Sequence, residues 1–557
     1  MKERAGRFLF AWALGGTASF FALGFFQNFF PSLWGFVLFA LLLNTTFTPA
    51  FEIALEQAIF ALRNKPQEKI VPLAILTLGV LWVVFTFRLL IQYPTLFSFD
   101  FFLPEPRLIP AFLGSMLLSL PLSVIFLQKL DSTDWRTSSF IIWTKRNLPG
   151  LLPASAIFIS AYALATVFVS ADLALADNYF DTDSPIWINF LTAAPEEALS
   201  VRAVHPYVLM LLRPPVWMLS LLLNGDKFHA ALLLNAFVGG ACVFLTWSFF
   251  KQRTNNTSYA LLVASLLGYS NSHLLLSVFL ESYIFSAAAL IASVMLLQRE
   301  NAKLVRVVPV GLITFGITIT NFVQTCITFL LTQRSLRNTL KYVFITIALA
   351  TALSFTQTLI QPNSQPFYIP SNLTYEAAFQ RDLVNVPLSQ TISRANVISR
   401  TITLFSVVAP RPLILLEEIG CSVPCFNAIR LFQGRYEYAS YVGFGSLLAR
   451  AWFGLLALAA SLFLWRAFRS PKNASLQAAL ALNVLFNFIL HMNYGDDPML
   501  YSPNWTYALI FFFGISLEKL ADKKWVQIGL LAFVTALLFN NIDLFRRMLD
   551  AILPFFG

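Results

Sequence analysis

The residues best suited to chemistry lie in a polar segment at positions 172–215. Its motif DNYFDTD carries Asp177, Asp181 and Asp183, whereas the chain around the segment is largely uncharged. Acids at a membrane–water boundary usually mark ion, proton or substrate chemistry, because a carboxylate is costly there unless it is solvated or paired. Such a carboxylate can act as a general base on a hydroxyl group. Asp181 and Asp183 are also spaced to share a divalent cation, magnesium or manganese, through oxygen ligands.

A second set of polar residues completes the candidate site. Glu281 is predicted at the outer end of a helix, on the same side of the membrane as the acidic segment. The same face would hold the candidates for substrate binding, which are Asp177, Arg202, His205, Asn321, His491 and Tyr501. Structural roles are the alternative. Loop acids can cap the helix that follows, a carboxylate is favoured at a helix N-terminus, and a histidine can bond a backbone carbonyl.

The elements that position these residues are predicted to be membrane-spanning helices. The 557 residues are 57% hydrophobic and 12% charged, against roughly 25% charged in soluble globular domains. Repeated apolar runs of about 20 residues indicate many bilayer-spanning helices. The formal net charge of +10 comes mainly from Lys and Arg clusters between these runs. This is the positive-inside pattern, so membrane lipids and not nucleic acid are the expected surroundings.

The charge clusters predict a cytoplasmic N-terminus and an all-α polytopic bundle of about 13 transmembrane helices. If residues 205–223 formed a full span, Lys251 and Arg253 would lie outside the cell. We therefore predict that this segment is an interfacial helix on the outer surface, interrupted by Pro214 and Pro215.

The run at positions 307–337 begins and ends with cytoplasmic cations but is too short for two ordinary spans. Two half-helices that break near Asn321 would satisfy both constraints, and such breaks usually line a cavity. Cys421 and Cys425 form a CSVPC pair for which a local disulfide is favoured over a redox-active pair. Four regions are predicted: an N-terminal module of about four helices at 1–147, a core with the catalytic loop at 148–360, an external region at 361–440, and C-terminal helices at 441–557.

The sequence resembles the GT-C superfamily of integral-membrane glycosyltransferases, in particular the family 39-like members. The resemblance covers residues 148–341 best. DNYFDTD matches the first external loop, VHPYVLMLLRPP the HPPL-type surface helix, ESYIFSAAAL the segment of the second acid, and GITITNFVQ the broken helix. GDDPMLYSPNWTY is similar to a later outer-loop segment of bacterial members.

The resemblance implies transfer of a sugar, with inversion, from a polyprenyl-phosphate donor to a glycan, lipid or protein acceptor. The site would lie on the extracytoplasmic face of the plasma (inner) membrane. Asp181 or Asp183 would be the catalytic base or a metal ligand, and Glu281 the second acid. Asn321 stands where the family often has lysine, so Arg202 is expected to supply the phosphate-binding cation.

Two other functions fit the same sequence. A transporter or flippase of a lipid-linked sugar would need charged residues along a route through the membrane and an internal repeat. No convincing repeat is present, and the acids are predicted on one face. A non-catalytic GT-C-like scaffold that binds a glycolipid is the third possibility.

Overall fold

The computed structural model describes residues 2–29, 32–64, 66–97, 102–131, 137–170, 173, 178–298, 302–381, 385–415, 423–432, 435–470 and 474–555. These ranges are mostly helical and contain four short strands. The predicted all-α class is therefore confirmed, with small β-hairpins added in one loop region.

Ten helices within the described ranges are long and apolar enough to cross a membrane, as expected for a polytopic membrane protein. They are α1 (Lys2–Phe26), α2 (Leu33–Asn64), α3 (Pro66–Ile91), α4 (Ile109–Asp131), α5 (Ser139–Phe168), α8 (Lys227–Thr254), α14 (Leu336–Ile360), α17 (Phe444–Arg469), α18 (Ser475–Asn493) and α20 (Lys524–Ile552). The bent pair α9 (Thr257–Gly268) and α10 (Asn271–Val278), with 60° between them, makes eleven if it counts as one span. A total of about 13 spans stays a prediction.

The chain divides into two compact units. The first comprises residues 1–73, 93–149 and 221–226. Its helices α1, α2 and α4 pack around a small core of Leu23, Phe36, Ala40 and Phe112. The second unit comprises residues 74–92, 150–220 and 227–557, and it holds every candidate site residue that the structure describes. The predicted module at 1–147 thus overlaps the first unit, but α3 from Ala74 onward belongs to the second.

Helix α7 (Val208–Leu221) corresponds to the predicted interfacial helix. Its 14 residues extend about 21 Å, which is too short to cross a hydrocarbon core of about 30 Å. The predicted interruption is wrong, because the helix continues through Pro214 and Pro215. The fixed φ of proline suits a helix even though two backbone bonds are lost. Arg213 and Trp217 also anchor α7, since both donate to carbonyls at the end of α6 (Ser184–Thr192).

The predicted pair of half-helices is confirmed. Helix α12 (Leu304–Ile317) and helix α13 (Ile319–Gln333) are separated by one extended residue, Thr318, three positions before Asn321. The polar groups freed at the break are bonded to the loop that precedes α7. The Ile319 N–H donates to Val204 O at 3.1 Å, and Ile317 O accepts from His205 Nδ1 at 2.5 Å.

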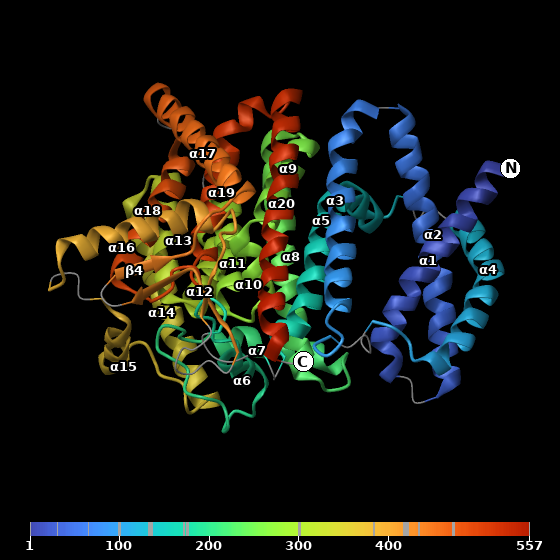
Figure 1. Cartoon of the computed structure of the whole chain (residues 1–557), viewed down its shortest axis with the longest axis horizontal. Coiled ribbons are helices and arrows are strands. Elements are labelled where there is room, and N and C mark those ends of the chain that lie inside the picture. Colours follow the sequence, from blue (N-terminus) through green and yellow to red (C-terminus); the bar gives the residue numbers. More distant parts are fainter. Residues whose placement is uncertain are drawn as a thin grey trace. The chain divides into compact units, whose positions relative to one another are not determined.

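Two helices of the second unit are buried along most of their length. All 15 residues of α19 (Pro503–Leu517) are buried, as are most of α11 (Ser282–Leu297). A helix that is apolar on all sides belongs in the interior of a bundle. Gly514 permits close packing here, since a Cβ at this position would lie 2.5 Å from the Phe250 ring in α8. Helices α8, α9 and α20 run side by side in the same bundle (Figure 1).

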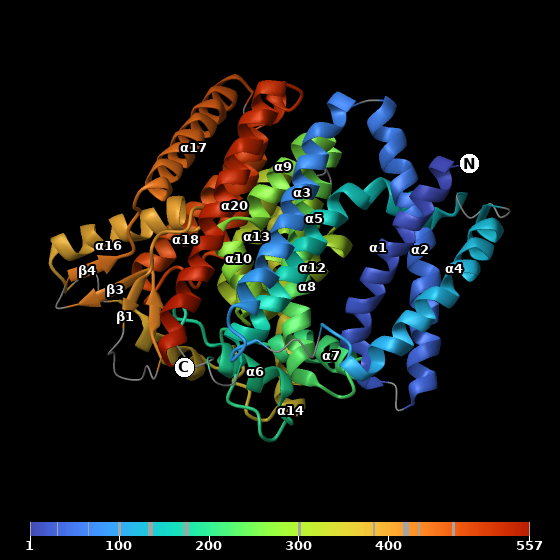
Figure 2. The ribbon, with the colours of Figure 1, turned by 45° about the vertical axis from the view of Figure 1, so that its right-hand side comes forward.

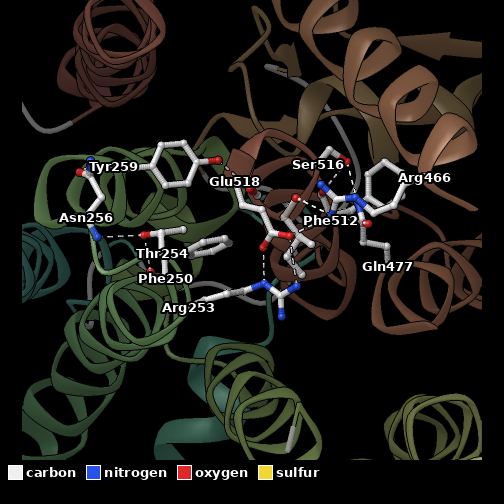
Figure 3. A network of polar contacts seen from close by, with 12 residues as sticks. Phe250, Arg253, Thr254, Asn256, Tyr259, Arg466, Gln477, Phe512, Ser516 and Glu518 are labelled. Carbon is white, nitrogen blue, oxygen red and sulfur yellow. Dashed lines mark hydrogen bonds and ion pairs between the residues drawn. The ribbon is translucent and has the colours of Figure 1, made fainter. Parts of the chain in front are cut away.

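An ion-pair cluster ties several helices together just after α19 (Figure 3). The Glu518 carboxylate accepts hydrogen bonds from Arg253 of α8 and, at 3.0 Å, from Arg466 of α17. Arg466 also donates to Gln477 of α18 at 3.0 Å. The carboxylate therefore joins α8 and α17 to the end of α19, and Arg466 extends the cluster to α18.

The region predicted as an external loop contains short elements. They are α15 (Pro370–Thr374), α16 (Leu388–Arg400), a π-helix at Thr401–Phe405, and the strands β1 (Leu413–Leu415), β2 (Cys425–Asn427), β3 (Ile429–Phe432) and β4 (Arg435–Tyr438). Strand β1 pairs antiparallel with β2, and β3 with β4. Figure 2 shows α16 beside β3 and β4. Cys425 is disulfide-bonded, whereas Cys421 lies outside the described residues.

Candidate active site

A strained turn positions Asp181. Phe180 and Asp181 both have positive φ, 55° and 67°, which costs about 1–3 kcal/mol for each non-glycine residue. Packing holds the turn in place. The Tyr179 ring stacks on Phe279 at 4.8 Å and on Phe426 at 5.7 Å, and the Phe180 N–H donates to Phe426 O at 2.6 Å. Strain maintained by surrounding structure is concentrated at functional sites, so this turn supports a role for Asp181.

Asp183 and Glu281 are brought together at the starts of two helices. The Asp183 N–H donates to Glu281 Oε1 at 2.5 Å. The Glu281 carboxylate, 2% exposed, also accepts from the Ser282 N–H and the Trp187 side chain. Burial, and secondly the Asp183 charge, raise the pKa of Glu281 well above its usual value. A carboxyl group with a raised pKa can hold and release a proton near neutral pH.

Asp497 fastens the Asp181 turn to the loop after α18. Its backbone N–H donates to Asp181 Oδ2 at 3.3 Å. Its own carboxylate accepts from the N–H groups of Ala428 at 2.6 Å and Met499 at 2.8 Å. Burial raises the pKa of Asp497 to about 6, although these hydrogen bonds act in the opposite direction. Asp497 thus supports the site, whereas the neighbouring Asp496 forms an ion pair with Arg381.

Three tyrosines surround the acids. The Tyr501 ring lies 5.2 Å from the Tyr283 ring and 6.1 Å from the Tyr494 ring. Burial raises the pKa of Tyr501, and the charges of Asp181 and Glu281 add to the effect. The Tyr501 hydroxyl therefore stays protonated and can donate a hydrogen bond to an oxygen of a substrate.

Arg202 is part of an ion pair at this site. Its Nε donates to Glu376 Oε1 at 2.9 Å, and its Nη2 donates to Glu376 Oε2 and to the Tyr494 hydroxyl, the latter at 2.8 Å. The Tyr494 hydroxyl donates in turn to Glu376 Oε2 at 2.6 Å. The guanidinium also lies over the Phe379 ring at 4.2 Å. The predicted phosphate-binding cation is consequently held in a fixed position by Glu376, which offsets its charge.

His205 has a structural position next to the site. Its Nδ1 donates to Ile317 O, and its ring lies 5.4 Å from Trp187, the residue that bonds Glu281. Burial lowers the pKa of His205 to about 4, so the imidazole is neutral at pH 7. His205 positions Trp187 and, through the carbonyl bond, the broken helix.

Three predicted residues remain, and each has a different position. The His491 ring packs 4.5 Å from Tyr501 and therefore borders the site. Asn321 instead donates to Asn504 Oδ1 at 2.9 Å, inside the helix bundle. Asp177 lies outside the described residues.

Asp181 and Asp183 are the residues predicted to share a divalent cation. Among the described residues no group of three or more His, Cys, Asp and Glu side chains is arranged to hold a metal ion. Magnesium commonly binds through one or two carboxylates, with water and substrate phosphate as its other ligands. Two aspartates are consistent with that kind of site, but not with a cage made of protein ligands alone.

Sequence reasoning missed Trp187, Tyr283, Glu376 and Tyr494. Tyr283 lies two residues after Glu281 in ESY, which was a usable signal. Glu376 carries no signal, because its partner Arg202 is 174 residues away.

Comparison of the chain with protein-family models, with curated proteins and with solved structures finds no match.

Proposed function

We propose that this chain is a polytopic GT-C-like glycosyltransferase. It would transfer a sugar from a polyprenyl-phosphate donor to an extracytoplasmic glycan, lipid or protein acceptor. The observation that supports the proposal is the convergence of Asp181, Asp183 and Glu281, three acids from two distant segments, beside a tyrosine cluster. Distinct environments for neighbouring carboxyl groups are the arrangement that acid–base chemistry requires.

In the proposed step Asp181 removes the proton from an acceptor hydroxyl. The acceptor oxygen forms a bond to the anomeric carbon of the sugar, while the bond from that carbon to the phosphate oxygen breaks. The polyprenyl phosphate leaves with the electron pair, and attack from the opposite face inverts the anomeric centre. Asp181 is better suited to be the base than Glu281, because it is only partly buried and the burial of Glu281 favours its protonated form.

Hydrogen-bond donors would stabilise the charge that develops on the departing phosphate. Tyr501 offers a protonated hydroxyl, and Arg202 offers a guanidinium that Glu376 holds in place. A divalent cation on Asp181 and Asp183 would supply further neutralisation of the phosphate. The donor would reach the site through the lipid phase, which fits a chain with many membrane-spanning helices.

The test uses the full chain in liposomes with polyprenyl-phosphate-linked hexoses and pentoses that carry tritium in the sugar. Release of polyprenyl phosphate together with a labelled product supports the proposal. Asp181→Asn should lower the rate by about 100-fold or more, the usual contribution of a general base. Asp496→Asn is the matched control, because this exposed acid is paired with Arg381 and should leave the rate unchanged. Equal rates for the two variants would contradict the assignment of Asp181.

Transport of a lipid-linked sugar is a second candidate, favoured by a polar seam inside the bundle. Gln324 of α13, Asn483 of α18 and Tyr507 of α19 are buried and hydrogen-bonded to one another through the Tyr507 hydroxyl. The Oδ1 atoms of Asn483 and Asn487 have no hydrogen-bond partner among the described residues. If the seam is a transport route, Asn483→Leu should abolish flipping of a fluorescent lipid-linked sugar. If the seam is not a route, the variant should leave glycosyl transfer intact.

A further inference from the structure

A pocket of about 370 Å³ lies apart from the acids, between the start of α17 and the second half of α20. Its lining includes the polar residues Arg411, Asn540, Asp543 and Arg547 and the aromatic residues Phe444 and Phe539. None of these residues belongs to the candidate active site. The pocket therefore needs its own explanation.

The charges in this pocket favour an anion. Arg547 is paired with Asp543 at 2.6 Å. The exposed guanidinium of Arg411, by contrast, has no hydrogen bond or ion pair with any residue that the structure describes. A guanidinium without a carboxylate partner can bind a phosphate through two parallel hydrogen bonds. The first turn of α17 also faces the pocket, and helix N-termini attract negative charge.

The position of the pocket along α17 and α20 corresponds to the level of the lipid headgroups in a membrane. Arg547 lies 23 residues after Lys524 in α20, or about 35 Å along the helix axis, and Phe444 lies about 33 Å from Arg466 in α17. A hydrocarbon core is about 30 Å thick. When Lys524 and Arg466 lie at one membrane surface, the pocket therefore lies near the opposite surface. Phe444 and Phe539, each 57% exposed, line the same pocket as Arg411 and offer apolar contact for acyl chains.

We propose that this pocket binds an anionic membrane lipid. Arg411 bonds the phosphate of its headgroup, and the acyl chains lie along Phe444 and Phe539. The inference does not depend on the proposed glycosyl transfer, because it uses a different set of residues. Free inorganic phosphate has the same charged group, but it would make no use of the exposed phenylalanines.

Native mass spectrometry of the delipidated full chain tests the proposal. Phosphatidylglycerol, phosphatidylcholine and inorganic phosphate are titrated in separate experiments. We expect one tightly bound phosphatidylglycerol, at least tenfold weaker binding of phosphatidylcholine, and no displacement by inorganic phosphate at millimolar concentration. Arg411→Ala should weaken phosphatidylglycerol binding at least tenfold, and Arg411→Lys should restore most of it.

Arg450→Ala is the control, because Arg450 is exposed on α17, the helix that carries Phe444, but does not line the pocket. It should bind phosphatidylglycerol as the unmodified chain does. Equal lipid retention by Arg411→Ala and Arg450→Ala would overturn the proposal, as would equal affinity for the two lipids. Displacement by inorganic phosphate would identify the ligand as a free anion and reject the lipid. Phe539→Ala provides a second check, since it should weaken lipid binding without affecting phosphate.

Discussion

The backbone N–H of Asp183 donates a hydrogen bond to the Glu281 carboxylate and joins the start of α6 to the start of α11. The two residues are 98 positions apart in the chain. This contact holds the Asp181 turn beside a carboxyl group whose protonated form is favoured by burial.

Glu281→Gln should separate stability from activity. The raised pKa of Glu281 means that its favourable contribution to folding is present below the usual glutamate pKa and is lost as the pH rises through the folded-state pKa. A neutral amide avoids that loss and can still accept from the Asp183 N–H. We therefore expect the variant to unfold at or above the temperature of the unmodified chain at pH 8. Transfer should fall at least tenfold, because an amide cannot hold and release a proton as the proposed second acid would.

Glu281→Leu is the contrasting variant at the same position. It would leave the buried donors of Asp183, Ser282 and Trp187 without an acceptor, and each such group costs about 1–3 kcal/mol. Thermal unfolding in detergent should show a clear loss of stability. Unfolding temperatures that are the same for Gln and Leu would argue against the hydrogen-bonding role given to this carboxylate.

His205 should make the protein sensitive to acid. Its pKa is lowered by burial from 6.5 to about 4, so its contribution to stability is present above pH 6.5 and is lost as the pH falls through 4. His205→Gln keeps a side-chain donor for Ile317 O but cannot titrate. Its unfolding temperature should therefore fall less steeply between pH 6.5 and 4. His229→Gln, at the start of α8, is the control and should keep the original slope.

The ion pair of Arg202 and Glu376 can be measured with a double-mutant cycle. The two side chains are 29% and 9% exposed, so removing either leaves a poorly solvated charge, at a cost approaching the 3–5 kcal/mol seen for fully buried pairs. Arg202→Met and Glu376→Leu should each destabilise the protein more than the two together. Additive effects would show that the residues do not interact in solution.

Glu518 should be required for assembly of the helix bundle. Glu518→Gln removes the carboxylate that accepts hydrogen bonds from both Arg253 and Arg466 (Figure 3). We expect a lower unfolding temperature and more rapid proteolysis of the chain. Asp550→Asn is a suitable comparison, because this acid makes an exposed i,i+4 pair with Arg546, and such pairs contribute about 0.3–0.5 kcal/mol.

The sequence allowed good prediction of elements whose cause is local. Apolar runs and charge clusters identified the long helices, and the limited length of one run predicted a break near Asn321, which the structure has at Thr318. The 60° bend between α9 and α10 was not predicted, because the groups that stabilise it come from elsewhere. The N–H groups of Asn271 and Ser272 donate to carbonyls of residues 406 and 407, more than 130 positions later.

For the candidate site, the sequence indicated individual residues but not their partners from distant parts of the chain. Residue type and the surrounding pattern pointed to Asp181, Asp183 and Glu281. In the structure the Asp183 N–H bonds Glu281, and Asp181 lies two residues before Asp183 in a turn that bonds Asp497. The pairing of Arg202 with Glu376 and Tyr494 could not be predicted, since ion pairs between distant loops follow no periodic pattern. The same applies to the packing that holds the positive φ of Phe180.

The contacts of the Asp181 turn also set the order in which the protein can be assembled during synthesis. The turn needs Phe426 for its backbone bond and Asp497 for the bond to its carboxylate, and these residues are translated long after it. Chains of this size generally fold segment by segment as they emerge. The turn therefore lacks these two contacts while most of the helices are inserted, and it is completed only after α18 and the loop that carries Asp497 have been synthesised.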